Sequence, residues 1–436
     1  MNLTMKFGFY TLGCKVNQYE SQALEKDFIA RGYEPGRFDE PCDFYVVNTC
    51  TVTAVSDKKS RNALRRARKL NPEAVIGVCG CYAQVHPEDM EKLEVDVVGG
   101  TGDRNAFIDR LEQFRADHRH SVQVDNAFRR KGFEVLEPGG LGERTRAMLK
   151  VEDGCVNFCT YCIIPYARGA IRSLPLDTAV RQVKELRDQG YREVVVTGIE
   201  ISSWGADLKN GQKPEDLIYA ICQAVPEMRV RLGSLEPRTV DPDFCETLKD
   251  CKNLCPQFHL SLQSGCDATL QRMHRKYSTD RYLESCRLLR EAFPNCAITT
   301  DLIVGFPQET EEEFAETLEF LKKAQFAAMH IFPYSRRTGT PAAEMPGQVP
   351  QAEKEHRAAR AAGVESALRE GYQKSFIGAT LPVLFEQQDA QGRWTGHTTN
   401  YILVAVESER DLHNQILEVP ITGWESHGLL GRLKAE

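Results

Sequence analysis

The sequence predicts an α/β protein in three parts: a parallel α/β unit, a central partial (β/α)6 barrel of TIM-like design and a small C-terminal β-barrel. Three observations lead to this fold class. Strand and helix signals alternate in two separate runs, a polar stretch with Pro138-Gly139-Gly140 divides them, and short turn-bounded strands follow from about residue 378. A length of 436 residues suits several domains. The expected domains span residues 1–117, 141–370 and 372–436.

In the first run, helices are expected at 21–31 and 58–70, between strands expected at 6–11, 44–48, 74–78 and 95–98. Cys14, Cys50 and Cys81 each follow a predicted strand. Ligands of open parallel sheets gather at the carboxyl ends of the strands, so these thiols are expected to converge. Three unrelated turn cysteines remain an alternative on the pattern alone.

The second run follows a linker expected at about 115–145. Helices at 177–189 and 310–324 alternate with strands expected at 146–152, 193–197, 229–233, 258–262, 297–304 and 328–333. Chemistry in such a barrel is expected at the carboxyl ends of the strands. A charged helix, 351–371, then leads to barrel strands expected at 381–386, 394–398, 402–406 and 415–421.

Composition narrows the class of protein. The chain has no apolar run long enough for a membrane span and no signal-peptide pattern, so a cytoplasmic location without a membrane partner is expected. The 15 cysteines are an odd number in a long chain, which disfavours a secreted disulfide framework. The net charge is −7, so a nucleic-acid partner would need a local basic cluster such as residues 58–69. The alternative for that cluster is a solvated helix face.

The most informative motif is C-x3-C-x2-C, formed by Cys155, Cys159 and Cys162 after the first barrel strand. A [4Fe–4S] cluster usually takes four thiolates, so three leave one iron open. The motif resembles that of radical-SAM enzymes, in which S-adenosylmethionine (SAM) binds the open iron and is cleaved to a 5′-deoxyadenosyl radical. The resemblance makes these cysteines catalytic metal ligands. Contacts to SAM are expected from strand ends, at Thr197, Gly198, Ser234, Glu236, Gln263, Asp301 and Gly305.

The whole chain resembles the methylthiotransferase family of radical-SAM enzymes. TLGCKVNQYES, NTCTV and GVCGCYAQ resemble its N-terminal domain, and HTTNYILVAV with HGLLGRL resembles an RNA-binding TRAM domain. The resemblance implies a second [4Fe–4S] cluster on Cys14, Cys50 and Cys81, used to deliver sulfur. Cys79 remains open as the third ligand. Implied partners are a tRNA anticodon stem-loop, an external electron donor and a sulfur source.

Three substrate classes are familiar in that family: threonylcarbamoyladenosine in tRNA, isopentenyladenosine in tRNA, and an aspartate of a ribosomal protein. TLGCKVNQYES, CTVTAVSDKKSR and TGIEISSWG most resemble the threonylcarbamoyladenosine enzymes, which act at position 37. Because that nucleoside carries a carboxylate, its site is expected to offer arginines, with candidates at Arg168, Arg172, Arg336 and Arg337.

Other interpretations stay open. The same chemistry could act on isopentenyladenosine, and the chain could be a non-enzymatic iron–sulfur RNA-binding protein. The complete cysteine triad argues against this non-enzymatic interpretation. A structural zinc protein is disfavoured because paired C-x2-C knuckles are absent from the sequence.

Overall fold

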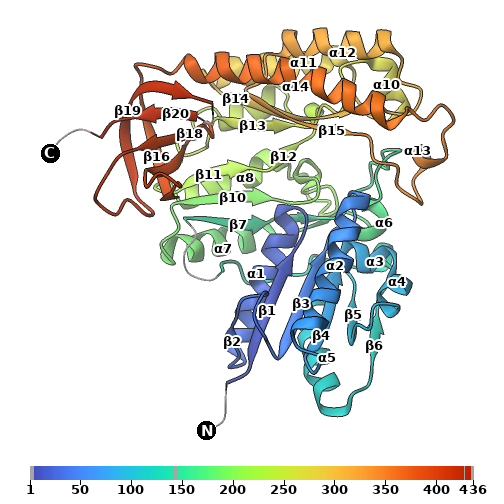
Figure 1. Cartoon of the computed structure of the whole chain (residues 1–436). Helices are drawn as coiled ribbons and strands as arrows, with labels where there is room; N and C mark the ends of the chain where they lie inside the picture. The colour runs from blue at the N-terminus through green and yellow to red at the C-terminus, as the bar shows by residue number, and fades with distance from the viewer. Residues whose placement is uncertain (1–3, 141–144, 427, 434–436) are drawn as a thin grey trace.

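The computed structural model describes residues 4–140, 145–426 and 428–433. It shows an N-terminal α/β unit, a central open barrel above it and a small closed barrel at one side (Figure 1). The predicted α/β fold class is therefore confirmed. Residues 141–144, where the central domain was expected to start, lie outside the described residues, and the domain boundaries remain predictions.

The N-terminal sheet has six strands in the order β2-β1-β3-β4-β5-β6, and every neighbouring pair is parallel. Helix α2 (Ala54–Leu70) packs on one face, and α1 (Lys15–Ala30) with α5 (Arg104–Asp117) packs on the other. Burial of both faces explains the continuous apolar sequence of β3 and β4. The strands are β1 (Lys6–Thr11), β2 (Glu34–Pro35), β3 (Phe44–Thr49), β4 (Val75–Gly80), β5 (Val97–Gly99) and β6 (Ser121–Gln123).

Two expectations about this unit were wrong. Strand β6 lies inside the stretch that was predicted to be an irregular linker, and it forms the edge of the sheet beside β5. Three residues are too few for a periodic signal, so only the sheet reveals this strand. Helix α1 begins at Lys15 instead of residue 21, and its added first turns are buried through Val16 and Tyr19, as the later turns are through Leu24 and Phe28.

The central unit carries the six predicted parallel strands in chain order, with β10 (Glu193–Thr197), β14 (Ala297–Val304) and β15 (Ala328–Pro333) at the predicted bounds. Together with the short β12, which follows β11 directly after Gly233, they form two sheets, β11-β10-β7 and β12-β13-β14-β15. This is the expected partial barrel. The remaining strands are β7 (Arg146–Lys150), β11 (Arg229–Leu232), β12 (Ser234–Leu235) and β13 (Gln257–Leu260), with a small ribbon of β8 (Glu152–Asp153) and β9 (Arg172–Ser173).

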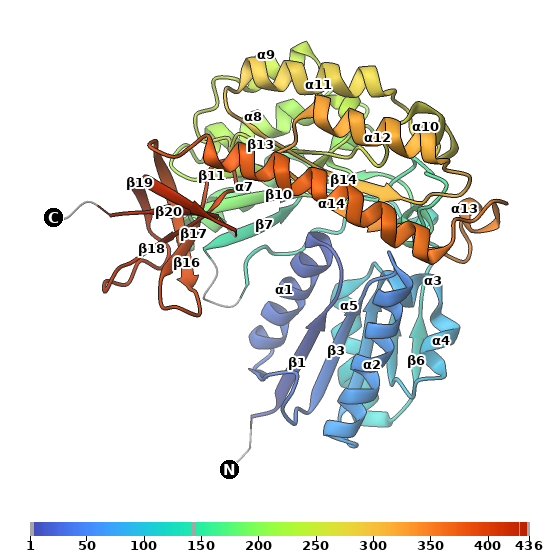
Figure 2. The ribbon, with the colours of Figure 1, turned by 45° about the horizontal axis from the view of Figure 1, so that its top comes forward.

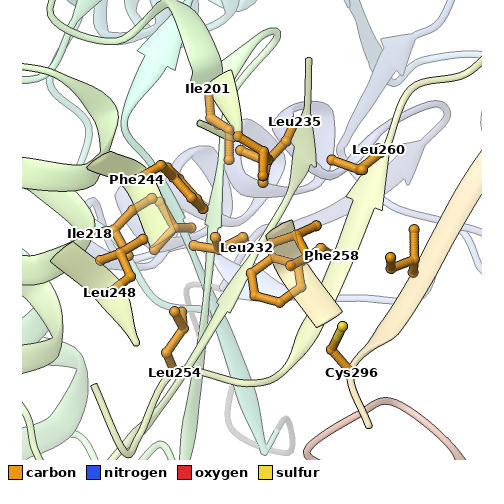
Figure 3. Packing of buried hydrophobic residues seen from close by; sticks show 14 of the residues in the cluster. Ile201, Ile218, Leu232, Leu235, Phe244, Leu248, Leu254, Phe258, Leu260 and Cys296 are labelled. Carbon is orange, nitrogen blue, oxygen red and sulfur yellow. The ribbon is translucent and has the colours of Figure 1, made fainter. Parts of the chain in front are cut away.

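Helices cover the outer face of this barrel and bury its largest apolar cluster. Phe244 and Ile218, from two of these helices, pack against Leu232 and Phe258 of the strands (Figure 3). Helix α14 (Gln351–Lys374) crosses the central unit and reaches the small barrel (Figure 2). The other helices of the central unit are α6 (Ile164–Arg168), α7 (Leu176–Asp188), α8 (Pro214–Ala224), α9 (Pro242–Leu248), α10 (Asp267–Arg272), α11 (Thr279–Ala292), α12 (Glu311–Ala324) and α13 (Pro341–Glu344).

The C-terminal strands close into a barrel in the order β16-β17-β18-β20-β19. The predicted small β-barrel is therefore confirmed. Arg229 and Arg231 of the central unit donate hydrogen bonds to carbonyl oxygens of this barrel and its 398–399 turn, which fixes the two units together. The strands are β16 (Thr380–Gln388), β17 (Trp394–Thr398), β18 (Leu403–Val406), β19 (Ile416–Glu425) and the unpredicted β20 (Gly428–Gly431). Within the described ranges, no helix is long and apolar enough to cross a membrane.

Candidate active site

The loop that bears Cys155, Cys159 and Cys162 lies between β8 and α6, at the carboxyl end of the first barrel strand. Its backbone is pinned: the Cys155 amide donates to Gly169 (3.0 Å) and the Cys162 amide donates to Cys159 (2.9 Å). Gly154 has φ +96°, and a Cβ there would lie 2.0 Å from the Ala170 carbonyl oxygen. Only glycine fits that turn.

Cys159 is buried, and Cys155 and Cys162 are half-buried. Burial, together with the neighbouring Cys159, raises the pKa of Cys162 to about 12. Arg275 Nη1 lies 3.2 Å from Cys159 Sγ, so a half-buried guanidinium faces the cysteine loop. A cation at this distance favours the thiolate form of a cysteine, which is the form that binds a metal.

The predicted convergence of Cys14, Cys50 and Cys81 is visible in the structure. A Cβ added to Gly13 would lie 3.0 Å from Cys50 Sγ, which places the first two turns together. Burial raises the pKa of Cys81 to about 12, with Cys14 and Cys50 among the neighbours that raise it. Cys79 points instead into the apolar cluster under β4. The structure therefore brings Cys81 to the other two cysteines, and not Cys79.

The two cysteine sets face a common region, since Cys81 also contributes to the raised pKa of Cys162. Among the described residues, no three His, Cys, Asp or Glu side chains gather tightly enough to hold a single metal ion. A cubane cluster binds each thiolate to a different iron, so its ligands stand apart. Each of the two sets offers three thiols, the number that leaves one iron of a [4Fe–4S] cluster open.

A cavity of about 290 Å³ lies beside the cysteine loop, and residues that follow Cys50 form part of its wall. Val52 and Thr53 follow Cys50 on one side, and Cys162 stands on the other. Two predicted cofactor contacts also line it: Gln263, which follows β13, and Asp301, which lies within β14. Its remaining lining is mostly aromatic and aliphatic: Tyr161, Ile163, Ile164, Ile303, Phe332, Pro333, Tyr334 and Ser335.

The other predicted cofactor contacts are distributed differently. Glu236 lines a second hollow of about 190 Å³ together with Asn157 of the cysteine loop. Thr197 is buried at the end of β10, and Gly198 packs so closely on Glu152 that a Cβ would meet its Oε2 at 2.8 Å.

Ser234 and Gly305 lie in neither hollow. Ser234 is exposed, and Gly305 lies against Lys354 of α14, where a Cβ would meet the lysine Cγ at 2.4 Å. Thr197 and Gly198 line neither hollow either, so the strand-end rule brings three of the seven predicted residues to a hollow: Gln263 and Asp301 line the first, and Glu236 lines the second.

Two models of known families match this sequence: Radical SAM superfamily over residues 149–321 and Uncharacterized protein family UPF0004 over residues 6–100. The Threonylcarbamoyladenosine tRNA methylthiotransferase MtaB of Bacillus subtilis (strain 168) is 38% identical, over 95% of this chain and 93% of the relative. The chain belongs to the radical-SAM methylthiotransferase family. It is an enzyme of sulfur and methyl transfer that uses SAM and [4Fe–4S] clusters.

Other relatives of this methylthiotransferase carry a different name. The tRNA-2-methylthio-N(6)-dimethylallyladenosine synthase of Moorella thermoacetica is 33% identical, over 98% of both chains. Among solved structures, the radical S-adenosylmethionine methyltransferase TsrM from Kitasatospora setae has a TM-score of 0.56 at 16% identity, covering 78% of this chain and 77% of its own. That likeness concerns the fold alone.

The methylthiotransferase also has site residues that sequence reasoning missed. Glu200 lies in the second hollow, and its Oε1 has no hydrogen-bond partner among the described residues. Burial raises its pKa to about 7, although Arg275 opposes the shift. A buried acceptor beside Cys155 can bind an ammonium group. Glu200 could have been predicted from the string TGIE, which includes the end of a predicted strand. No sequence pattern marks Arg275 as a site residue.

The four predicted substrate arginines of the methylthiotransferase are placed unevenly. Arg168 and Arg172 are buried, and both are drawn into ion pairs with Asp153. Arg337 is held by Asp57 (2.5 Å) and Thr51. Protein partners occupy these three guanidinium groups, which argues against their binding a substrate carboxylate. Arg336 alone is exposed, next to Ser335 of the cavity.

Proposed function

We propose that this methylthiotransferase converts N6-threonylcarbamoyladenosine at position 37 of tRNA to its 2-methylthio derivative. The observation that carries the proposal is the cavity lined by Cys162 and by Val52 and Thr53, which follow Cys50, in a chain 38% identical to a threonylcarbamoyladenosine enzyme. A substrate base in that cavity would meet both the radical source and the sulfur source. Relatives that act on dimethylallyladenosine are 33% identical, so that substrate is the second candidate.

In this proposal Cys155, Cys159 and Cys162 hold the cluster that binds SAM, and Cys14, Cys50 and Cys81 hold the second cluster. Together these groups would supply a hydrogen-abstracting radical and a methylated sulfur atom. Glu200, which lines the second hollow, accepts hydrogen bonds from the ammonium group of SAM. Arg275 counters the negative charge of the thiolates through its contact with Cys159.

The cavity offers the chemistry that a nucleobase needs. Tyr161, Phe332 and Tyr334 give it an aromatic lining, while Gln263 and Asp301 provide polar groups for the base edge. An adenine in a single-stranded loop leaves its stack at low cost. Arg336 is exposed, and its Nε donates to the Ala343 carbonyl (2.8 Å). No hydrogen bond or ion pair within the described ranges engages its terminal nitrogens, which can therefore bind the carboxylate of the threonyl group.

The substrate assignment is tested by offering two modified tRNAs to the reconstituted enzyme. Product is expected on the threonylcarbamoyladenosine tRNA, with kcat/KM on the isopentenyladenosine tRNA lower by about 10- to 100-fold, the range given by one charged hydrogen bond. The measurement is liquid chromatography with mass spectrometry of the digested nucleosides. Product on the isopentenyl substrate alone would replace this assignment with the second candidate.

Binding of tRNA is proposed to rest on helix α2 together with the C-terminal barrel, residues 372–436. Five basic side chains of α2 are exposed, and within the described chain no ion pair engages them: Lys58, Lys59, Arg65, Arg66 and Lys69. Thr53 caps this helix and also lines the cavity, so the basic face leads toward the reaction site. The barrel itself carries more carboxylates than cations. Phosphate contacts are therefore expected mainly from α2.

Replacing both Arg65 and Arg66 by Ala should weaken tRNA binding several-fold. The slope of log K against log salt should become shallower by about 0.7–0.9 for each phosphate that the variant no longer neutralises. Fluorescence anisotropy with labelled tRNA at several salt concentrations measures both quantities. Arg287→Ala serves as the control, since Arg287 is an exposed cation on α11 that is already paired with Glu284. An unchanged affinity and slope in the double variant would count against α2 as the RNA surface.

A further inference from the structure

Arg168 contacts the cysteine-bearing turns of both halves of the molecule. It is fully buried, with 0% of its side chain exposed. Its Nε lies 3.4 Å from Cys81 Sγ, its Nη2 donates to Asn17 Oδ1 (2.7 Å) and its Nη1 donates to Glu20 Oε1 (2.5 Å). All three partners belong to the N-terminal unit, whereas Arg168 ends α6 of the central unit.

Asn17 extends this contact to the other two cysteine turns. Its Nδ2 donates to the carbonyl of Leu12 (2.8 Å) and to the carbonyl of Thr49 (2.9 Å). Leu12 lies two residues before Cys14, and Thr49 directly precedes Cys50. One guanidinium therefore touches Cys81 itself and the amide side chain that clamps the turns of Cys14 and Cys50.

On its other side Arg168 belongs to the loop of Cys155, Cys159 and Cys162. Its Nη1 lies 3.5 Å from Asp153, two residues before Cys155. The carbonyl of Gly169, the next residue, accepts the Cys155 amide. A displacement of Arg168 would therefore move both cysteine sets relative to each other.

The surrounding charges favour an anionic group at Cys81. Two buried carboxylates, Glu20 and Asp153, face four buried cations, which leaves positive charge beside the thiol: Arg104, Arg168, Lys150 and Arg172. Hydrogen bonds and positive charge at a cluster sulfur stabilise the reduced state and raise the reduction potential.

We propose that Arg168 is a positioning residue that fixes the second cluster against the radical-generating loop and raises its reduction potential through the N–H···S hydrogen bond to Cys81. The proposal rests on the proposed assignment of Cys14, Cys50 and Cys81 as cluster ligands. It goes beyond that assignment because it names the group that tunes and places the cluster.

Arg104 provides a matched control. It is equally buried and bonds the same carboxylate, with Nη2 2.7 Å from Glu20 Oε2. Its hydrogen bonds within the described chain go to oxygen atoms and not to sulfur, and its Nε has no partner there. Arg104→Lys therefore disturbs the ion network without removing a bond to Cys81, whereas Arg168→Lys keeps the charge and removes that bond.

The experiment uses full-length protein in which Cys155, Cys159 and Cys162 are Ala, so that the second cluster alone remains. Reduction is followed by electron paramagnetic resonance (EPR) in a potentiometric titration. With Arg168→Lys, the ratio of reduced to oxidised cluster at a fixed potential should fall about tenfold, which corresponds to about 59 mV for a one-electron couple. With Arg104→Lys, the midpoint should stay unchanged. An unchanged midpoint for Arg168→Lys, or equal shifts in both variants, would overturn the proposal.

Iron analysis separates the possible failures. The parent protein is the one in which only Cys155, Cys159 and Cys162 are Ala. If it did not hold about four irons, the cluster assignment would be overturned, and this proposal with it. If only the Arg168→Lys variant loses its iron, the hydrogen bond to Cys81 is tested in the parent protein labelled with 15N-arginine. Pulsed EPR should then show a 15N coupling to the reduced cluster. Absence of that coupling would refute the hydrogen bond to Cys81.

Discussion

Replacement of Cys155, Cys159 or Cys162 by Ala is expected to abolish reductive cleavage of SAM. Each thiol belongs to the pinned loop at the mouth of the barrel, and each is proposed to bind a different iron. Loss of one ligand leaves the cluster with two protein thiolates and no single open iron for SAM. The measurement is 5′-deoxyadenosine formed under anaerobic reducing conditions, which should fall to the background without enzyme.

Cys286→Ala is the control for these variants. Cys286 is buried in the core cluster behind the strands, and the change removes one sulfur atom at a modest cost in stability. This variant should form 5′-deoxyadenosine at the normal rate. Continued formation by any of the three loop variants would show that the loop does not hold the cluster.

The triple replacement of Cys14, Cys50 and Cys81 by Ala is expected to separate two activities. The variant should keep about four of about eight irons, because one of two [4Fe–4S] clusters is lost. It should still cleave SAM, since the loop of Cys155 is untouched. It should form no methylthio product, because no sulfur is delivered. Iron content, 5′-deoxyadenosine and modified nucleoside are measured on the same preparation.

Cys79→Ala is the matched control, since Cys79 lies two residues from Cys81 but points into the apolar cluster. It should keep both clusters and make product. A triple variant that retained about eight irons would contradict the second cluster, and loss of half the iron in Cys79→Ala would make Cys79 the ligand.

Much of this site followed from the sequence because its rules are local. A cysteine that follows a buried strand is expected at the carboxyl edge of a parallel sheet, and this rule together with the family resemblance predicted that Cys14, Cys50 and Cys81 converge. The C-x3-C-x2-C spacing likewise fixed the loop of Cys155. The start of α1 was missed because Cys14 serves as its N-cap without a side-chain cap hydrogen bond, a signal that sequence rules do not contain.

The roles of the arginines could not be predicted, because they depend on contacts between distant segments. Arg168 pairs with Glu20, which is 148 residues away in the sequence, and Arg337 pairs with Asp57, which is 280 residues away. Arg168 was predicted to contact the substrate because it follows the cysteine loop in the sequence. Most of its hydrogen-bond acceptors, however, lie in the N-terminal unit. The same reason hid Arg275, whose partner Cys159 is 116 positions away.

The most direct test of the proposed activity is mass spectrometry of tRNA nucleosides from cells with and without this protein. We expect that 2-methylthio-N6-threonylcarbamoyladenosine disappears when the protein is removed and that N6-threonylcarbamoyladenosine accumulates in its place. The intact protein should restore the product, whereas the variant lacking Cys14, Cys50 and Cys81 should not. Unchanged levels of that nucleoside, with loss of the 2-methylthio derivative of isopentenyladenosine instead, would contradict the proposed activity.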